Sequence, residues 1–170
     1  PKDKSAGKGK PPPAAVPAVE VSSIPYAAMI SALLNGQQYS SKTDEFVAPD
    51  GTKLCGSHTI ARYFAYDNVD LTGGKNAAKA CAIHQWTDFV LLHINTSSGL
   101  QALDAHLETN TYIVGYTMTL ADVVAWGALR GSSLFDENKL ASTRTHLTRW
   151  YRHCAKLNTF QQFSSAPPTV

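Results

Sequence analysis

Apolar residues recur at helical spacing along most of this chain. In residues 76–95, NAAKACAIHQWTDFVLLHIN, they lie three or four positions apart, at Ala80, Ile83, Trp86, Val90 and Ile94. This spacing places them on one face of an amphipathic helix. Further helices are predicted over residues 100–108, 119–131 and 146–157. After Lys75 the pattern therefore predicts helices only.

The elements before Lys75 are shorter and mixed. AVEV at residues 18–21 is a candidate strand, and DEFVAPDGTKL at residues 44–54 is typical of two strands joined by a PDG turn. One helix is predicted over residues 22–36 and another over residues 56–67. The chain should thus fold as a small α+β subdomain followed by an α-helical bundle.

The sequence predicts which residues lie at the ends of these two N-terminal helices. The first should have Ser23 near its N-cap, Pro25 in its first turn and Gly36 beyond its end. The second should open at Ser57. It carries three large apolar residues on one face: Ile60, Tyr63 and Phe64.

The segment TLADVVAWGALRG, residues 119–131, opens with a hydroxyl and a carboxylate three positions apart. This is the spacing of a capping box, in which Thr119 caps the helix and Asp122 reaches back to the cap N–H. The residues that follow are apolar on every face, which predicts a buried core helix. Thr119 and Asp122 are therefore interpreted as structural rather than catalytic residues.

The composition excludes several classes of protein. Hydrophobic residues make up 44% and charged residues 16% of the chain, and no stretch reaches the ~18 apolar residues of a membrane span. The three cysteines are Cys55, Cys81 and Cys154, too few and too scattered for a disulfide framework. Reduced thiols and a cytoplasmic location are expected. No cysteine pair and none of the six histidines has metal-ligand spacing, so no metal is expected.

The formal excess of positive charge lies in a short leader. Residues 1–20 carry four lysines and two acidic residues, whereas the remaining residues carry eleven basic and eleven acidic side chains. Residues 1–17 are rich in Lys, Pro and Gly, which predicts a disordered leader that contacts RNA weakly at most. Residues 164–170, SSAPPTV, read as the start of a linker, which indicates a domain cut from a longer chain.

Four segments read together resemble the glutathione-transferase-like N-terminal domain of eukaryotic glutamyl-tRNA synthetases: GSHTIARYFA, IHQWTDF, TYIVGYTMTLADVVAWGALRG and HLTRWYRHC. The resemblance covers residues 18–163. It implies a degenerate thioredoxin-like subdomain over residues 18–70 and a helical subdomain over residues 71–163. The similar domains of methionyl-tRNA synthetase, of synthetase-associated scaffold proteins and of an elongation-factor subunit stay open as alternatives.

The resemblance also allows the glutathione site to be tested residue by residue. An active transferase of this shape has a Ser, Tyr or Cys after the first strand, a cis-proline before the third, and Glu or Gln followed by Ser at the next helix start. Ser23 and Ser57 lie at the first and last of these positions, but Gly56 and Glu45 replace the acidic or amide residue and the cis-proline. Ser23 and Ser57 are therefore interpreted as helix caps, with a vestigial glutathione-like site as the alternative.

The resemblance implies an assembly domain without catalytic residues or cofactors, attached to a glutamate–tRNA ligase. It would dock onto a transferase-like domain of another synthetase or of a scaffold protein, and self-pairing stays open. Arg149, next to Trp150, matches the residue that the family places in its contact surface, and a planar guanidinium suits such a contact. The expected contact residues on the last long helix are Arg144, His146, Arg149 and Arg152, and a second surface would use Arg62 and Tyr66. A nucleic-acid module is the competing class, using the basic residues between Lys139 and Lys156.

Overall fold

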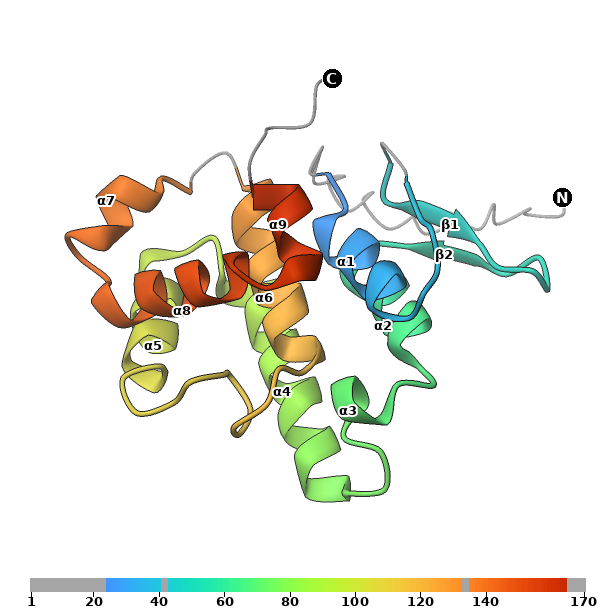
Figure 1. Ribbon diagram of the computed structural model, residues 1–170, viewed down its shortest axis with the longest axis horizontal. Coiled ribbons are helices and arrows are strands. Elements are labelled where there is room, and N and C mark those ends of the chain that lie inside the picture. The colour runs from blue at the N-terminus through green and yellow to red at the C-terminus, as the bar shows by residue number, and fades with distance from the viewer. Residues whose placement is uncertain (1–23, 41–42, 133–134, 165–170) are drawn as a thin grey trace, which may run out of the picture.

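The computed structural model describes residues 24–40, 43–132 and 135–164. The N-terminal part is small and mixed, as the sequence predicts (Figure 1). Its elements are α1 (Tyr26–Leu34), β1 (Glu45–Val47), β2 (Lys53–Cys55), α2 (Ser57–Ala65) and α3 (Val69–Thr72). The two strands pair antiparallel with Phe46 opposite Leu54, and a turn containing Pro49 joins them.

The start of the chain falls partly outside the described residues. The expected strand at 18–21, the leader at 1–17 and Ser23 all lie there, as do residues 165–170 of the expected linker. Helix α1 begins at Tyr26, with Pro25 at the N-cap position rather than in the first turn. Proline fits this position because the first N–H groups of a helix have no partner within the helix.

The C-terminal part is a bundle of helices: α4 (Ala77–His93), α5 (Ser97–His106), α6 (Leu120–Gly131), α7 (Glu137–Ala141), α8 (Thr145–Ala155) and α9 (Asn158–Ser164). Four of the six lie where the apolar spacing predicts them. Helices α7 and α9, like α3 in the N-terminal part, have no counterpart in the sequence prediction. Figure 1 shows the β-hairpin at one end of the molecule, α7 at the other, and α4 and α6 between them.

Helix α6 lies at the centre of the core, which confirms that its all-round apolar sequence belongs to a buried helix. Trp126 is fully buried, stacks on Tyr151 of α8 with ring centroids 5.3 Å apart, and meets Phe160 of α9 edge-on. Gly127 lets α6 approach α1 closely, because a Cβ atom there would lie 2.5 Å from the backbone nitrogen of Ala27. The contact between α1 and α6 joins the two parts of the molecule.

Candidate partner-binding surfaces

A buried carboxylate holds helix α8, which carries one of the candidate surfaces. Asp122 forms the expected capping box with Thr119, and both side chains are fully buried. One oxygen of Asp122 accepts from the backbone N–H and the hydroxyl of Thr119, at 2.9 and 3.1 Å. The other accepts from the Ile113 N–H and from the indole N–H of Trp150, both at 2.9 Å. Burial raises the pKa of Asp122, and the hydrogen bonds oppose that rise.

Through Asp122, α8 is fixed against the rest of the bundle. Leu147, Trp150 and Cys154 form its buried face, so Trp150 is a core residue, and burial raises the pKa of the Cys154 thiol. At the N-terminus of α8, the Asp104 carboxylate of α5 accepts from the Leu147 N–H at 2.8 Å. The opposite face of α8 is exposed and carries Arg149, Arg152 and His153. This exposed face is the first candidate surface.

Arg149 lies on this surface, and its guanidinium is held by its own chain. Its Nη2 donates to the carbonyl of Leu107 and, at 3.1 Å, to the carbonyl of Asn110. Leu107 is the C-cap of α5, where backbone carbonyls lack helical partners and a positive charge is favourable. The residue is exposed all the same. Its position is therefore fixed while a partner can still reach it.

The other predicted contact residues of α8 are less uniform than the sequence implies. Residues 139–156 contain no Asp or Glu, but Arg152 is ion-paired with Glu137 of α7 at 2.7 Å, so an acidic group does lie at this surface. Arg144 is half-buried at the N-cap of α8, and His146 is half-buried one turn before Arg149. His153 lies 3.1 Å from the hydroxyl of Tyr112.

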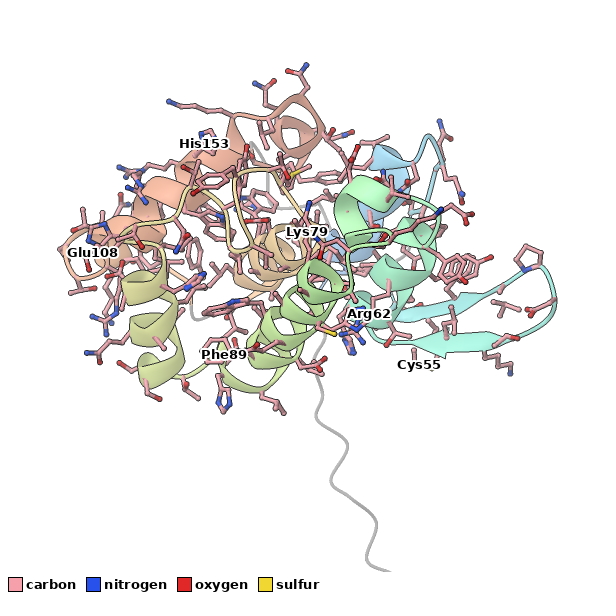
Figure 2. The ribbon with its side chains drawn as sticks, turned by 90° about the horizontal axis from the view of Figure 1, so that it is seen from below. Cys55, Arg62, Lys79, Phe89, Glu108 and His153 are labelled. Atoms are coloured by element: carbon pink, nitrogen blue, oxygen red, sulfur yellow. The ribbon has the colours of Figure 1, made fainter. Side chains whose placement is uncertain are left out.

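The second candidate surface lies on α2 and is clearly separated from α8, as the labelled Arg62 and His153 show (Figure 2). Tyr66, the C-cap of α2, is 80% exposed. Arg62 is half-buried and ion-paired with Asp88 of α4 at 2.8 Å. Burial lowers the pKa of the neighbouring His58, and the charge of Arg62 lowers it further. Only Tyr66 of the two predicted residues thus projects freely.

At the glutathione-like position the backbone conformation favours glycine. Gly56, rather than Ser57, is the N-cap of α2, and its φ of 92° is favourable only for glycine. Ser57 is the first helical residue and makes no cap bond, so its interpretation as a cap is wrong. Glu45, at the place of the cis-proline, begins β1 and pairs with Cys55. Within the described ranges there is also no cluster of three metal-ligating side chains.

Several residues of the first surface were not found from the sequence. Glu137 meets α8 from α7, and Asp104 meets it from α5. Asn110 and Tyr112 meet it from the loop between α5 and α6. The residues that they meet are 15 to 43 positions away in sequence. No local spacing signals such pairs.

Comparisons with known proteins agree with the fold described above. Residues 96–158 match the family "Glutathione S-transferase, C-terminal domain". The chain is 28% identical over 137 residues to a probable cytoplasmic glutamate–tRNA ligase of Dictyostelium discoideum, covering 77% of this chain and 18% of that protein. It is 32% identical over 112 residues to the cytoplasmic glutamate–tRNA ligase of Arabidopsis thaliana, covering 62% and 16%. The chain thus spans less than a fifth of these relatives.

Solved structures share the fold. A chain from a crystallographic study of yeast aminoacyl-tRNA synthetase complex formation has a TM-score of 0.64 at 19% identity, with 85% of this chain and 87% of that chain covered. A glutathione-bound transferase of Methylobacillus flagellatus has a TM-score of 0.66 at 16% identity, with 85% and 96% covered. The resemblance to glutamyl-tRNA synthetases is thereby confirmed. The chain has the glutathione-transferase-like fold, and residues 96–158 are similar to the C-terminal domain of glutathione S-transferases.

Proposed function

We propose that this chain is a non-catalytic docking domain of a cytoplasmic glutamyl-tRNA synthetase. It would attach the enzyme to a transferase-like domain of another synthetase or of a scaffold protein. The proposal is supported by the similarity to two glutamate–tRNA ligases, of which the chain spans only a small part. The likeness to a chain studied for yeast synthetase complex formation supports the fold such a role needs. None of the described helices is long and apolar enough to span a membrane.

The exposed, fixed guanidinium of Arg149 is the observation that carries this proposal. Two carbonyl oxygens hold one of its terminal nitrogens. A side chain that is already ordered loses less conformational entropy when a partner binds, which favours affinity. The planar group can stack on a partner and donate hydrogen bonds at the same time. Arg149 therefore has the properties of a central contact residue.

A transferase activity fits these residues poorly. Gly56 and Glu45 occupy two positions that a glutathione site would need, and Gly56 offers no side chain. Asp122 and Thr119 are fully buried and hydrogen-bonded to each other, so neither can reach a substrate. The role proposed here requires no cofactor and no catalytic side chain.

The test begins by identifying what the domain binds. The tagged full chain is used to capture partners with and without nuclease, and captured proteins are identified by mass spectrometry. The purified partner is then titrated calorimetrically with the parent chain, Arg149→Ala and Lys156→Ala. Lys156 is the matched control, because it is an exposed basic residue at the C-cap of the same helix. Thermal melts of each variant check that it is folded, since Arg149→Ala also loses two internal bonds.

A transferase-like partner and a loss of about thirtyfold or more in affinity for Arg149→Ala are expected, with little change for Lys156→Ala. Equal, strongly salt-dependent losses in both variants, or capture abolished by nuclease, would favour RNA binding instead. Normal binding by Arg149→Ala would move the contact to the Arg62 and Tyr66 surface or to self-pairing.

A second candidate is the corresponding domain of an elongation-factor subunit. The chain is 29% identical over 132 residues to a probable elongation factor 1-gamma of Arabidopsis thaliana, covering 61% of this chain and 32% of that protein. The sequence of the complete parent protein decides between the two, because a tRNA-ligase catalytic region would follow the domain only in a synthetase.

A further inference from the structure

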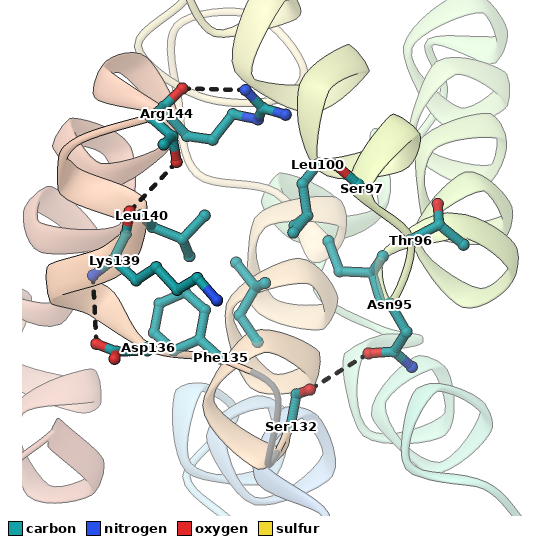
Figure 3. A pocket seen from close by; sticks show the side chains of 13 residues that line it. Asn95, Thr96, Ser97, Leu100, Ser132, Phe135, Asp136, Lys139, Leu140 and Arg144 are labelled. Carbon is teal, nitrogen blue, oxygen red and sulfur yellow. Dashed lines mark hydrogen bonds between the residues drawn. The ribbon is translucent and has the colours of Figure 1, made fainter.

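A pocket of about 260 Å³ opens between parts of five helices, and Arg149 does not line it. Its walls come from the C-terminal end of α4 and the start of α5, from the end of α6, from α7, and from the N-cap of α8 (Figure 3). This volume is below the ~300–1,000 Å³ typical of sites for drug-sized ligands and cofactors. It suits one or two side chains of a bound peptide.

The floor of the pocket is apolar. It is formed by Ile94, Leu100, Leu129, Phe135 and Leu140. An apolar side chain packed against these residues would gain about 25 cal/mol of binding free energy per Å² of apolar surface removed from water. The pocket therefore favours a bulky apolar group over a polar one.

Two cations stand at the edge of the pocket. Figure 3 shows the Lys139 side chain extending from α7 toward α6, and the Arg144 guanidinium reaching toward α5. Among the described residues, the Arg144 guanidinium donates only to the neighbouring Thr143 carbonyl, at 3.0 Å. No carboxylate of the described residues is ion-paired with either cation, in contrast to Arg62 and Arg152. The carboxylate of Asp136 lines the pocket too, but it accepts from the backbone N–H groups of Asn138 and Lys139.

The first turn of α5 contributes further positive potential. Thr96 is the N-cap of this ten-residue helix, and both Thr96 and Ser97 line the pocket. The first N–H groups of a helix lack helical acceptors, and the helix dipole makes this end positive. The pocket thus combines an apolar floor with a positively charged edge.

We propose that this pocket binds a short acidic segment of a partner protein, in which a bulky apolar side chain lies next to Asp or Glu. The apolar side chain would fill the floor, and the carboxylate would pair with Lys139 and Arg144. The leader of this chain is a poor occupant, because its excess of lysine would be repelled by the same cations. The proposal goes beyond docking through Arg149 and does not depend on it.

The test is a titration of the isotope-labelled full chain, followed by NMR, with the peptide acetyl-Ser-Asp-Leu-Phe-Asp-Ser-amide. One control peptide carries Asn in place of both Asp residues, and another carries Ala in place of Leu and Phe. Lys139→Glu and Arg144→Glu reverse the charges at the pocket. Lys156→Glu makes the same change at the far end of α8 and is the matched control.

We expect amide shifts concentrated at Ser97, Leu100 and Leu140, and an affinity about tenfold weaker for each pocket variant but not for Lys156→Glu. Both control peptides should bind much more weakly than the parent peptide. Absence of these shifts at about 1 mM peptide would overturn the proposal. Equal losses in all three protein variants would also overturn it. The same shifts with inorganic phosphate or with the Ala peptide would reduce the site to a simple anion site.

Discussion

Replacing Asp122 by Asn tests the buried network that fixes α8. Each oxygen of the carboxylate accepts two hydrogen bonds, and each takes one of them from a backbone N–H, of Ile113 or of Thr119. An Asn side chain has one oxygen, so its NH₂ group must face one of these N–H groups in either orientation. If the NH₂ group faces Ile113 and Trp150, two buried donors lose their acceptor, at ~1–3 kcal/mol each. If it faces Thr119, only the backbone N–H loses its acceptor, because the hydroxyl can turn and accept from the amide. The neutral amide recovers part of this loss because it avoids the cost of burying a charge.

The net expectation for Asp122→Asn is a loss of about 1–3 kcal/mol in the free energy of unfolding. Urea denaturation of the full chain measures this loss, and the indole N–H resonance of Trp150 shows whether its bond to residue 122 is kept. Asp88→Asn is the control, since Asp88 is 62% exposed and ion-paired with Arg62, and such pairs contribute about 0–1 kcal/mol. If the two variants unfold at the same urea concentration, the four-bond description of Asp122 is wrong.

Two further variants test the packing and the electrostatics. Gly127→Ala should be destabilising by about 1–2 kcal/mol, because overpacking against Ala27 outweighs the ~1 kcal/mol gain in helix propensity; a melting temperature equal to the parent's would contradict this. The pKa of His58 is lowered in the folded chain, so as the pH falls below about 6.5 the imidazole binds a proton more readily in the unfolded chain. The free energy of unfolding should therefore decrease as the pH falls below about 6.5. Denaturation of His58→Gln between pH 7 and about pH 5 should show a smaller decrease, and an unchanged pH profile would refute the assignment.

Long periodic segments could be predicted from the sequence because burial of one helix face depends on local spacing. Helix α4 shows this, with Ile83 and Val90 almost completely buried as their spacing predicts. Helices α7 and α9 have only five and seven residues, too few for a periodic pattern to be recognised. Phe160 of α9 is nevertheless fully buried against Trp126, a contact that only the tertiary fold creates.

The capping box was predictable for the same reason, since Thr119 and Asp122 are three positions apart. The two other donors to Asp122 were not, because Ile113 and Trp150 are 9 and 28 positions away. The sequence thus identifies a local cap, whereas the structure makes the same carboxylate the junction of α6, α8 and the loop before α6. A conservative change at Asp122 should therefore disturb the α8 surface as well as the start of α6.

The local sequence predicts poorly which charged side chains are paired in the fold. The segment from Lys139 to Lys156 contains no acidic residue. Yet packing brings Glu137 to Arg152 and the Leu107 carbonyl to Arg149, so these two cations are already partnered within the domain. Lys139 and Arg144 are paired with no carboxylate of the described residues. Carbonyl oxygens do not neutralise a guanidinium, so Arg149 keeps its positive charge, whereas Arg152 is neutralised by Glu137. Because an unneutralised charge acts over a longer distance than an ion pair, Lys139, Arg144 and Arg149 should all attract an acidic partner. Arg149 would add geometry to this attraction, because its guanidinium is an ordered planar group.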